Sequence, residues 1–178
     1  MKRILLAAAI GAALSSGAFA QSMSEKTGVN SALGIAPRTD DFVKEAAMSD
    51  MLEIEAAKLA QQRGNVEEKK FADMMVADHT KTSSELKTMV TGELKASLPE
   101  ALDESSRKKL DRLRNVKPDD FAAEYDPLQV SAHKDAVSLF ERYSKGGDNA
   151  SLKDWAGRTL PALQHHLEMA QDMNKNRK

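Results

Sequence analysis

The chain has 178 residues, with 26 Lys and Arg against 27 Asp and Glu, and it has no cysteine. Because the two signs of charge are interspersed and nearly balanced, there is no reason to expect nucleic acid or an anionic membrane surface as a partner. Without cysteine, neither a disulfide nor a lipid-modified N-terminal cysteine can form, so stability has to come from packing.

The first twenty residues have the three-part pattern of a secretory signal peptide. Lys2 and Arg3 are followed by an apolar run over residues 4–10, and Ala18-Phe19-Ala20 precedes Gln21. We predict cleavage after Ala20 and a periplasmic or secreted mature protein. No later segment approaches the roughly 20 apolar residues of a membrane span, so we expect no transmembrane segment in the mature chain.

Residues 21–38 are rich in Ser, Gly, Asn and Thr and lack periodicity, which predicts a flexible leader. Residues 39–178 form one predicted domain. It contains four segments with helical periodicity, at about 40–62, 66–91, 119–144 and 152–174, and no alternation typical of strands. The fold class is therefore predicted to be all-α.

The lengths of the connections indicate the topology. Asn65, with Glu68 three residues on, is a variant of the capping box that opens the second helix, and Gly92 ends it. The next connection, roughly residues 92–118, is long and holds a weak short helix at about 100–114, whereas the other connections are short. A single long crossover between helices two and three is the ferritin-like four-helix arrangement, and a plain up-down bundle with a decorated loop is the alternative.

Each predicted helix of the bundle carries one polar residue in the middle of its apolar face. At about 100° per residue, these inward residues are Glu53, His79, His133 and His166. Helical phasing places Glu55 on the outer face and His165 at the boundary with the polar face. The chain has only four histidines, so three of them are predicted to point into the bundle.

One inward polar residue per helix is how a bundle assembles a metal site. Three imidazoles and a carboxylate suit zinc, iron, manganese or copper, which the sequence does not separate. The leading hypothesis is an exported envelope protein of binding type that holds one metal ion. A metal with an open position would make a redox enzyme the alternative, and a hydrogen-bonded histidine cluster in a structural or interaction protein is the third. An envelope protein or a second copy of the chain stays open as partner.

Four segments of the predicted helices are distinctive: DFVKEAA at 41–47, EIEAAKLA at 53–60, FADMMVADH at 71–79 and LPALQHHL at 160–167. Together they closely resemble domain-of-unknown-function family 4142. Members of that family are exported bacterial proteins, often labelled predicted outer-membrane proteins, and are grouped with the ferritin-like four-helix bundles. The resemblance implies export and that fold, and it implies no particular reaction.

The resemblance also covers the four inward residues. The family's first-helix glutamate matches Glu53, its Asp-His pair resembles Asp78-His79, its third-helix histidine resembles His133, and its Pro-x-x-x-x-His resembles the segment from Pro161 to His166. One departure is at the start of the third helix. The family has Phe-Asp there, and this chain has Phe121-Ala122 with Tyr125 retained, so no role is carried over for that aspartate.

Ferritins themselves bind two irons through Glu-x-x-His on two helices. Here the residue three before His79 is Val76, and the residue three before His166 is Leu163. Because the bridging carboxylates are missing, neither ferroxidase activity nor iron storage is predicted from the fold.

Overall fold

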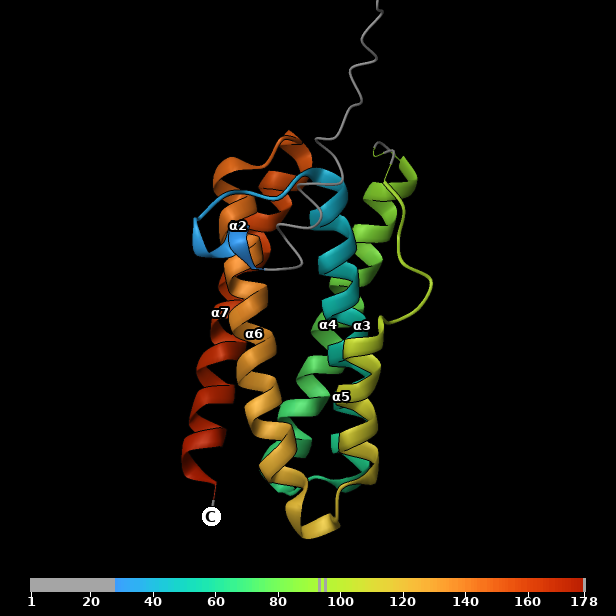
Figure 1. The fold of residues 1–178 in the computed structure, drawn as a ribbon, viewed down its shortest axis with the longest axis vertical. Helices are drawn as coiled ribbons and strands as arrows, with labels where there is room; N and C mark the ends of the chain where they lie inside the picture. The colour runs from blue at the N-terminus through green and yellow to red at the C-terminus, as the bar shows by residue number, and fades with distance from the viewer. Residues whose placement is uncertain (1–27, 93, 95, 178) are drawn as a thin grey trace, which may run out of the picture.

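The computed structural model describes residues 28–92, 94 and 96–177, which fold into helices with no strand among them (Figure 1). The helices are α2 (Val29–Ala32), α3 (Thr39–Arg63), α4 (Val66–Gly92), α5 (Glu104–Asn115), the 3-10 helix η1 (Pro118–Asp120), α6 (Phe121–Gly146) and α7 (Ala150–Asn176). The predicted all-α fold is confirmed. The predicted signal peptide, residues 1–20, lies outside the described residues.

Side-chain caps explain where the helices begin. The Asn65 side chain accepts hydrogen bonds from the backbone N–H of Glu67 and Glu68, and Glu68 Oε2 accepts from the Asn65 N–H at 2.7 Å, as the capping box predicts. Helix α7 begins earlier than residue 152, where the periodicity placed it, because Asn149 Oδ1 accepts the N–H of Leu152 at 2.9 Å.

The bundle consists of two helix pairs, in which α3 packs chiefly on α4 and α6 packs on α7. Between the pairs, the chain runs back along the bundle and carries α5, so that α4 and α6 point in the same direction (Figure 1). The long crossover is therefore present between the second and third long helices. None of the described helices combines the length and apolar character of a membrane span.

Residues 28–38, which belong to the leader predicted as flexible, include the short helix α2 and contact α6. The Arg142 guanidinium donates a hydrogen bond to the Ile35 carbonyl at 2.7 Å, and the hydroxyls of Ser31 and Ser138 lie 2.9 Å apart. Asn30 is buried. This part of the leader is thus packed against the domain. The sequence did not predict these contacts, because it lacks helical periodicity there.

The core is divided into two apolar clusters, one toward each end of the bundle. The first cluster contains Phe42, Val43, Ala46, Ala47, Leu86, Ala136, Leu139, Phe140, Tyr143, Leu152, Trp155, Ala156 and Leu163. The second contains Leu52, Ala56, Ala57, Ala60, Phe71, Ala72, Met75, Leu110, Leu113, Phe121, Tyr125, Ala170 and Met173. On every long helix, at least one buried polar residue lies between the two clusters, so the clusters are separated by a polar layer.

Helix α5 closes the side of the second cluster and is held there by Arg63. The Arg63 guanidinium donates hydrogen bonds to the carbonyls of Leu113, Arg114 and Val116, and its central carbon lies 5.1 Å from the centre of the Phe121 ring. The carbonyls at the end of a helix have no partners within it, so a cation there satisfies them and interacts favourably with the helix dipole.

We expect Arg63→Ala to lower the free energy of unfolding by about 2 kcal/mol, because three carbonyls lose a charged donor. Urea denaturation followed by circular dichroism measures this change. Lys58→Ala is the matched control on the same helix, because the Lys58 ion pair with Glu55 is exposed and should contribute under about 0.5 kcal/mol. Equal losses in the two variants would contradict this role for Arg63.

Candidate metal centre

The four inward residues predicted from helical phasing are all buried in the polar layer. Glu53 and His133 are each 1% exposed, and His79 and His166 are each 2% exposed. They come from the four long helices, one from each. His165, next to His166, is exposed, as its phase predicts.

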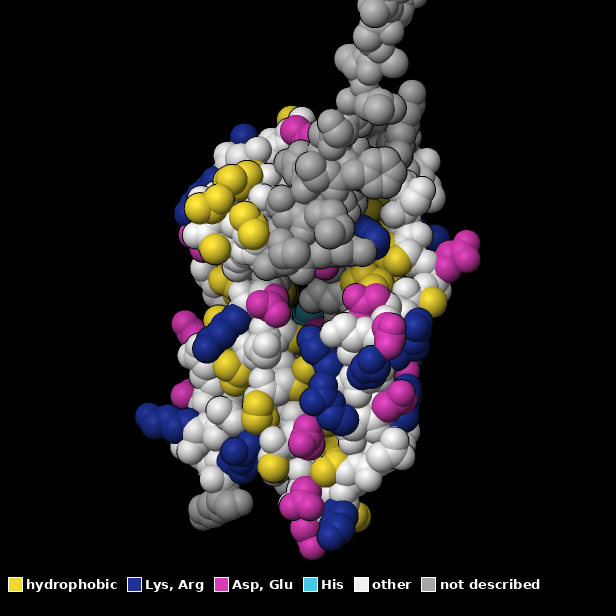
Figure 2. All heavy atoms as spheres, in the orientation of Figure 1, with side chains coloured by type: hydrophobic (Ala, Val, Ile, Leu, Met, Phe, Trp, Pro, Cys, Tyr) yellow, Lys and Arg dark blue, Asp and Glu magenta, His cyan; other side chains and the backbone are white. Residues whose placement is uncertain are grey.

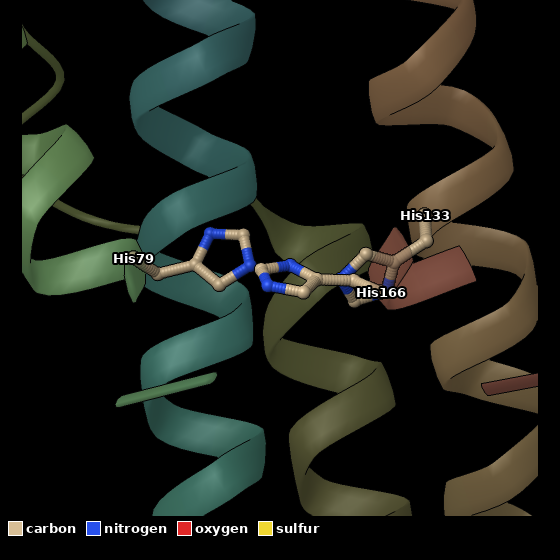
Figure 3. A group of neighbouring side chains, drawn as sticks. All are labelled: His79, His133 and His166. Carbon is tan, nitrogen blue, oxygen red and sulfur yellow. The ribbon is translucent and has the colours of Figure 1, made fainter. Parts of the chain in front are cut away.

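Three of these residues, His79, His133 and His166, converge on one point. One ring nitrogen of each lies within 4.8 Å of a ring nitrogen of both others, and the ring centres are 5.5 to 5.7 Å apart. Figure 3 shows the three side chains extending toward one another from α4, α6 and α7. This is the only such group of possible metal ligands within the described part of the chain.

Each imidazole forms a hydrogen bond on the side that faces away from this point. The three outward bonds are His79 Nδ1 to Asp50 Oδ1 at 2.8 Å, His133 Nδ1 to the Gln129 carbonyl at 2.9 Å, and His166 Nε2 to Asp78 Oδ2 at 2.9 Å. Carboxylates and carbonyls only accept hydrogen bonds, so each of these nitrogens carries the proton and donates it. The outward partners therefore determine the tautomer of each ring.

When a ring is neutral, its other nitrogen has a lone pair. These nitrogens are His79 Nε2, His133 Nε2 and His166 Nδ1, and none has a hydrogen-bond partner among the described residues. A histidine that donates one N–H to a carboxylate or carbonyl and presents its other nitrogen is the usual arrangement of a metal ligand. Here that arrangement occurs three times around one point.

Asp50 and Asp78, the two carboxylates that accept hydrogen bonds from the histidine rings, differ in their surroundings. Asp50 is buried and also accepts hydrogen bonds from the hydroxyls of Thr82 and Ser83, at 2.9 and 3.0 Å. The Asp78 side chain is 46% exposed and links His166 to the surface. Asp50 was not identified from the sequence, although it lies three residues before Glu53 and hence on a neighbouring part of the same helix face.

The pKa values follow from burial and from these partners. Burial, together with repulsion from His79, lowers the pKa of His133 to about 4. Burial also lowers the pKa of His166 to about 4, against the opposing effect of Asp78. For His79, burial acts in the same direction, but the hydrogen bond and charge of Asp50 outweigh it and raise the pKa. His133 and His166 are thus neutral near pH 7, which is the form that binds metals.

Glu53, the carboxylate in the predicted ligand set, lies in the same layer but is not a member of the converging group of histidines. Neither of its oxygens has a hydrogen-bond partner among the described residues. Burial raises the pKa of Glu53 to about 7, although attraction to His79 opposes this shift. The structure therefore brings the three histidines together and leaves the Glu53 carboxyl in the same layer but outside their group.

The inward ring nitrogens could form hydrogen bonds with one another or could bind a metal ion. In a self-contained hydrogen-bonded cluster, the inward nitrogens would share protons, but no hydrogen bond joins any two of the rings in the described structure. A tetrahedral ion bound at 2.0–2.1 Å holds its donor atoms about 3.4 Å apart. The three ring nitrogens lie within 4.8 Å of one another, so they need only a small inward movement to bind such an ion. The donor set therefore fits a metal ion.

The model of the family described as "Domain of unknown function (DUF4142)" matches residues 18–173. No curated protein and no solved structure matches the chain with significance. The family match thus spans both apolar clusters and the polar layer between them, and it supplies no function for the three histidines.

We expect Glu53→Gln to stabilise the metal-free protein at about pH 8, by about 2 kcal/mol, because the variant removes the cost of a buried charge. The pKa of Glu53 in the folded protein is about 7, above the ordinary value of 4.5, so the burial of the carboxylate destabilises the fold increasingly as the pH rises from 4.5 to 7. Below pH 4.5 the carboxyl is protonated in the folded and unfolded protein alike, and the gain in stability of the variant should vanish. Urea denaturation with a chelator measures the gain at each pH.

Glu55→Gln is the matched control, since Glu55 is half-buried, two residues away, and paired with Lys58. It should show almost no change over the same pH range. A loss of stability in Glu53→Gln at about pH 8 would show instead that the native protein favours the ionised carboxylate.

Proposed function

We propose that this chain, which belongs to the DUF4142 family, is a metal-binding protein that holds one transition-metal ion between α4, α6 and α7. The ligands are His79 Nε2, His133 Nε2 and His166 Nδ1. The observation that carries the proposal is that three buried ring nitrogens converge and have no hydrogen-bond partner among the described residues. Each such unsatisfied group costs roughly 1–3 kcal/mol, and one ion would satisfy all three.

The donor set favours a divalent ion of borderline softness. Neutral imidazoles suit Zn²⁺, Cu²⁺ and Fe²⁺, whereas Mg²⁺ and Ca²⁺ require oxygen ligands. Asp50 and Asp78, bonded to the outer sides of His79 and His166, supply two carboxylates that offset the two charges of such an ion. Buried charges need compensation of this kind.

Three histidines leave a fourth coordination position. We propose Glu53 as the residue that takes it or holds a water in it, because the Glu53 carboxyl is buried in the same layer and lies close enough to His79 for their charges to attract. Three protein ligands with a water in the fourth position is the pattern of catalytic zinc sites, so the arrangement would also permit metal-dependent chemistry.

We also propose that the protein works outside the cytoplasm. The support is the basic, apolar and small-residue order of residues 1–20. Protein recovered from the periplasm should then begin at Gln21, and a mass measurement of the intact chain establishes its first residue. A chain that keeps residues 1–20 would contradict export by this route.

The metal content of the purified protein tests the proposed function. We expect the wild-type protein to bind one Zn²⁺ or Cu²⁺ per chain in native mass spectrometry and equilibrium dialysis, and His79→Ala and His166→Ala each to weaken binding by about a hundredfold or more, because each removes one of three ligands. His165→Ala is the matched control, since it deletes the exposed neighbour of a proposed ligand. Equal, substoichiometric metal in all four proteins would refute the proposal.

The hydrogen bond behind His79 gives a second test. We expect Asp50→Asn to weaken metal binding by about tenfold, because the amide oxygen can still accept the His79 proton but no longer supplies a negative charge. A competition titration with a chelating dye measures this change. Asp73→Asn, which alters an exposed hydrogen bond to Gln61, should bind as tightly as the wild type. An unchanged affinity in Asp50→Asn would show that Asp50 does not act on the ion through His79.

A further inference from the structure

The proposed ligands are almost completely buried, so an ion needs a path to reach them. A groove of about 850 Å³ opens between α3, α5 and α6. Figure 2 shows this face of the molecule hollowed, with a histidine side chain, in cyan, visible deep in the hollow.

The floor of the groove directly adjoins the polar layer. Ser49 and Leu52 line it from α3 and are the neighbours of Asp50 and Glu53 in the chain. From α6 it is lined by Ala132 and Ala136, which lie beside and one turn after His133. The side chain of alanine ends at its methyl group, so the wall between the groove and the rings is thin on the α6 side.

A second pocket, of about 600 Å³, lies on the opposite pair of helices, α4 and α7. It reaches the layer at Asp78, which accepts the hydrogen bond of His166 Nε2. That nitrogen is the outward one, and the lone pair of His166 lies on the far side of the ring. An ion arriving from this pocket would meet a protonated nitrogen and would have to displace the ring.

The charges around the groove also bear on the passage of a cation. Asp103 and Asp135 line it together with Lys109 from α5, and the charge of Lys109 attracts both of these carboxylates as well as that of Glu53. Lys109 is therefore a positive charge placed among the carboxylates that an incoming ion would pass. The adjacent Lys108 also lines the groove, but its side chain is 68% exposed and its charge is offset by Glu104, with which it is paired at 2.6 Å.

We propose that the groove between α3, α5 and α6 is the route by which a divalent metal ion reaches the three histidines, and that Lys109 restricts its passage by charge repulsion. This inference rests on the proposed metal site. It adds the path of the ion and a residue that controls the rate of uptake without being a ligand.

The test measures how fast Co²⁺ is taken up by full-length protein that was stripped of metal with a chelator, from the absorbance of the bound ion. Ser49→Trp narrows the groove at its floor and should slow uptake by about fivefold or more, with the same final stoichiometry. Ala162→Trp is the matched control in the pocket between α4 and α7, where Ala162 is exposed, and it should load at the wild-type rate.

Lys109→Gln tests the charge and does not depend on whether the tryptophan variant folds. It should take up Co²⁺ about threefold faster than the wild type at low ionic strength, because a repulsive charge is removed from the path. The difference should shrink as salt screens the charges. Lys108→Gln, one residue away and paired on the surface, should change the rate little.

The outcomes separate this inference from the proposal on which it rests. A wild-type protein that binds no Co²⁺ would overturn the metal site and the route together. Normal stoichiometry with uptake in Ser49→Trp as fast as in Ala162→Trp, or faster, would overturn the route alone. An unchanged rate in Lys109→Gln would overturn the role of Lys109.

Discussion

The structure depends on three hydrogen bonds that point outward from the histidine rings. Asp50, the Gln129 carbonyl and Asp78 accept the ring protons, so the lone pairs of His79, His133 and His166 have to face one another. The apolar clusters on both sides of the layer keep the surroundings poor in other partners. The same burial that lowers the pKa of His133 and His166 keeps both rings neutral near pH 7, which is the form that can bind a metal.

This arrangement interrupts the core of a helical bundle at considerable cost. A continuous apolar core would bury more hydrophobic surface, and the unsatisfied atoms of the layer include both oxygens of Glu53 and both amide atoms of Gln129. Buried polar groups are nearly always satisfied in stable proteins, so three ring nitrogens that converge without a hydrogen-bond partner among the described residues indicate a role other than stability. The phase of the helices and the chemistry of the layer therefore both indicate a binding site at the three histidines.

Much of this could be predicted from the sequence, because it depends on local rules. Helical phasing placed His166 inward and His165 outward, and the capping box at Asn65 located the start of α4. The contacts between His79 and Asp50 and between His166 and Asp78 could not be predicted, because each depends on how a second helix is rotated against the first. Glu53 was phased correctly as buried, but phase alone does not give the distance between its carboxyl and the rings.

The three proposed metal ligands are distributed unevenly over the two helix pairs. His79 belongs to the pair α3 and α4, whereas His133 and His166 belong to α6 and α7, and the pairs meet each other less extensively than the helices within each pair. An ion at this point would connect the α3–α4 hairpin to the α6–α7 hairpin, across the less extensive interface between the two pairs. The metal-free chain would then separate along that interface first, and loading would convert two hairpins into a single cooperative unit.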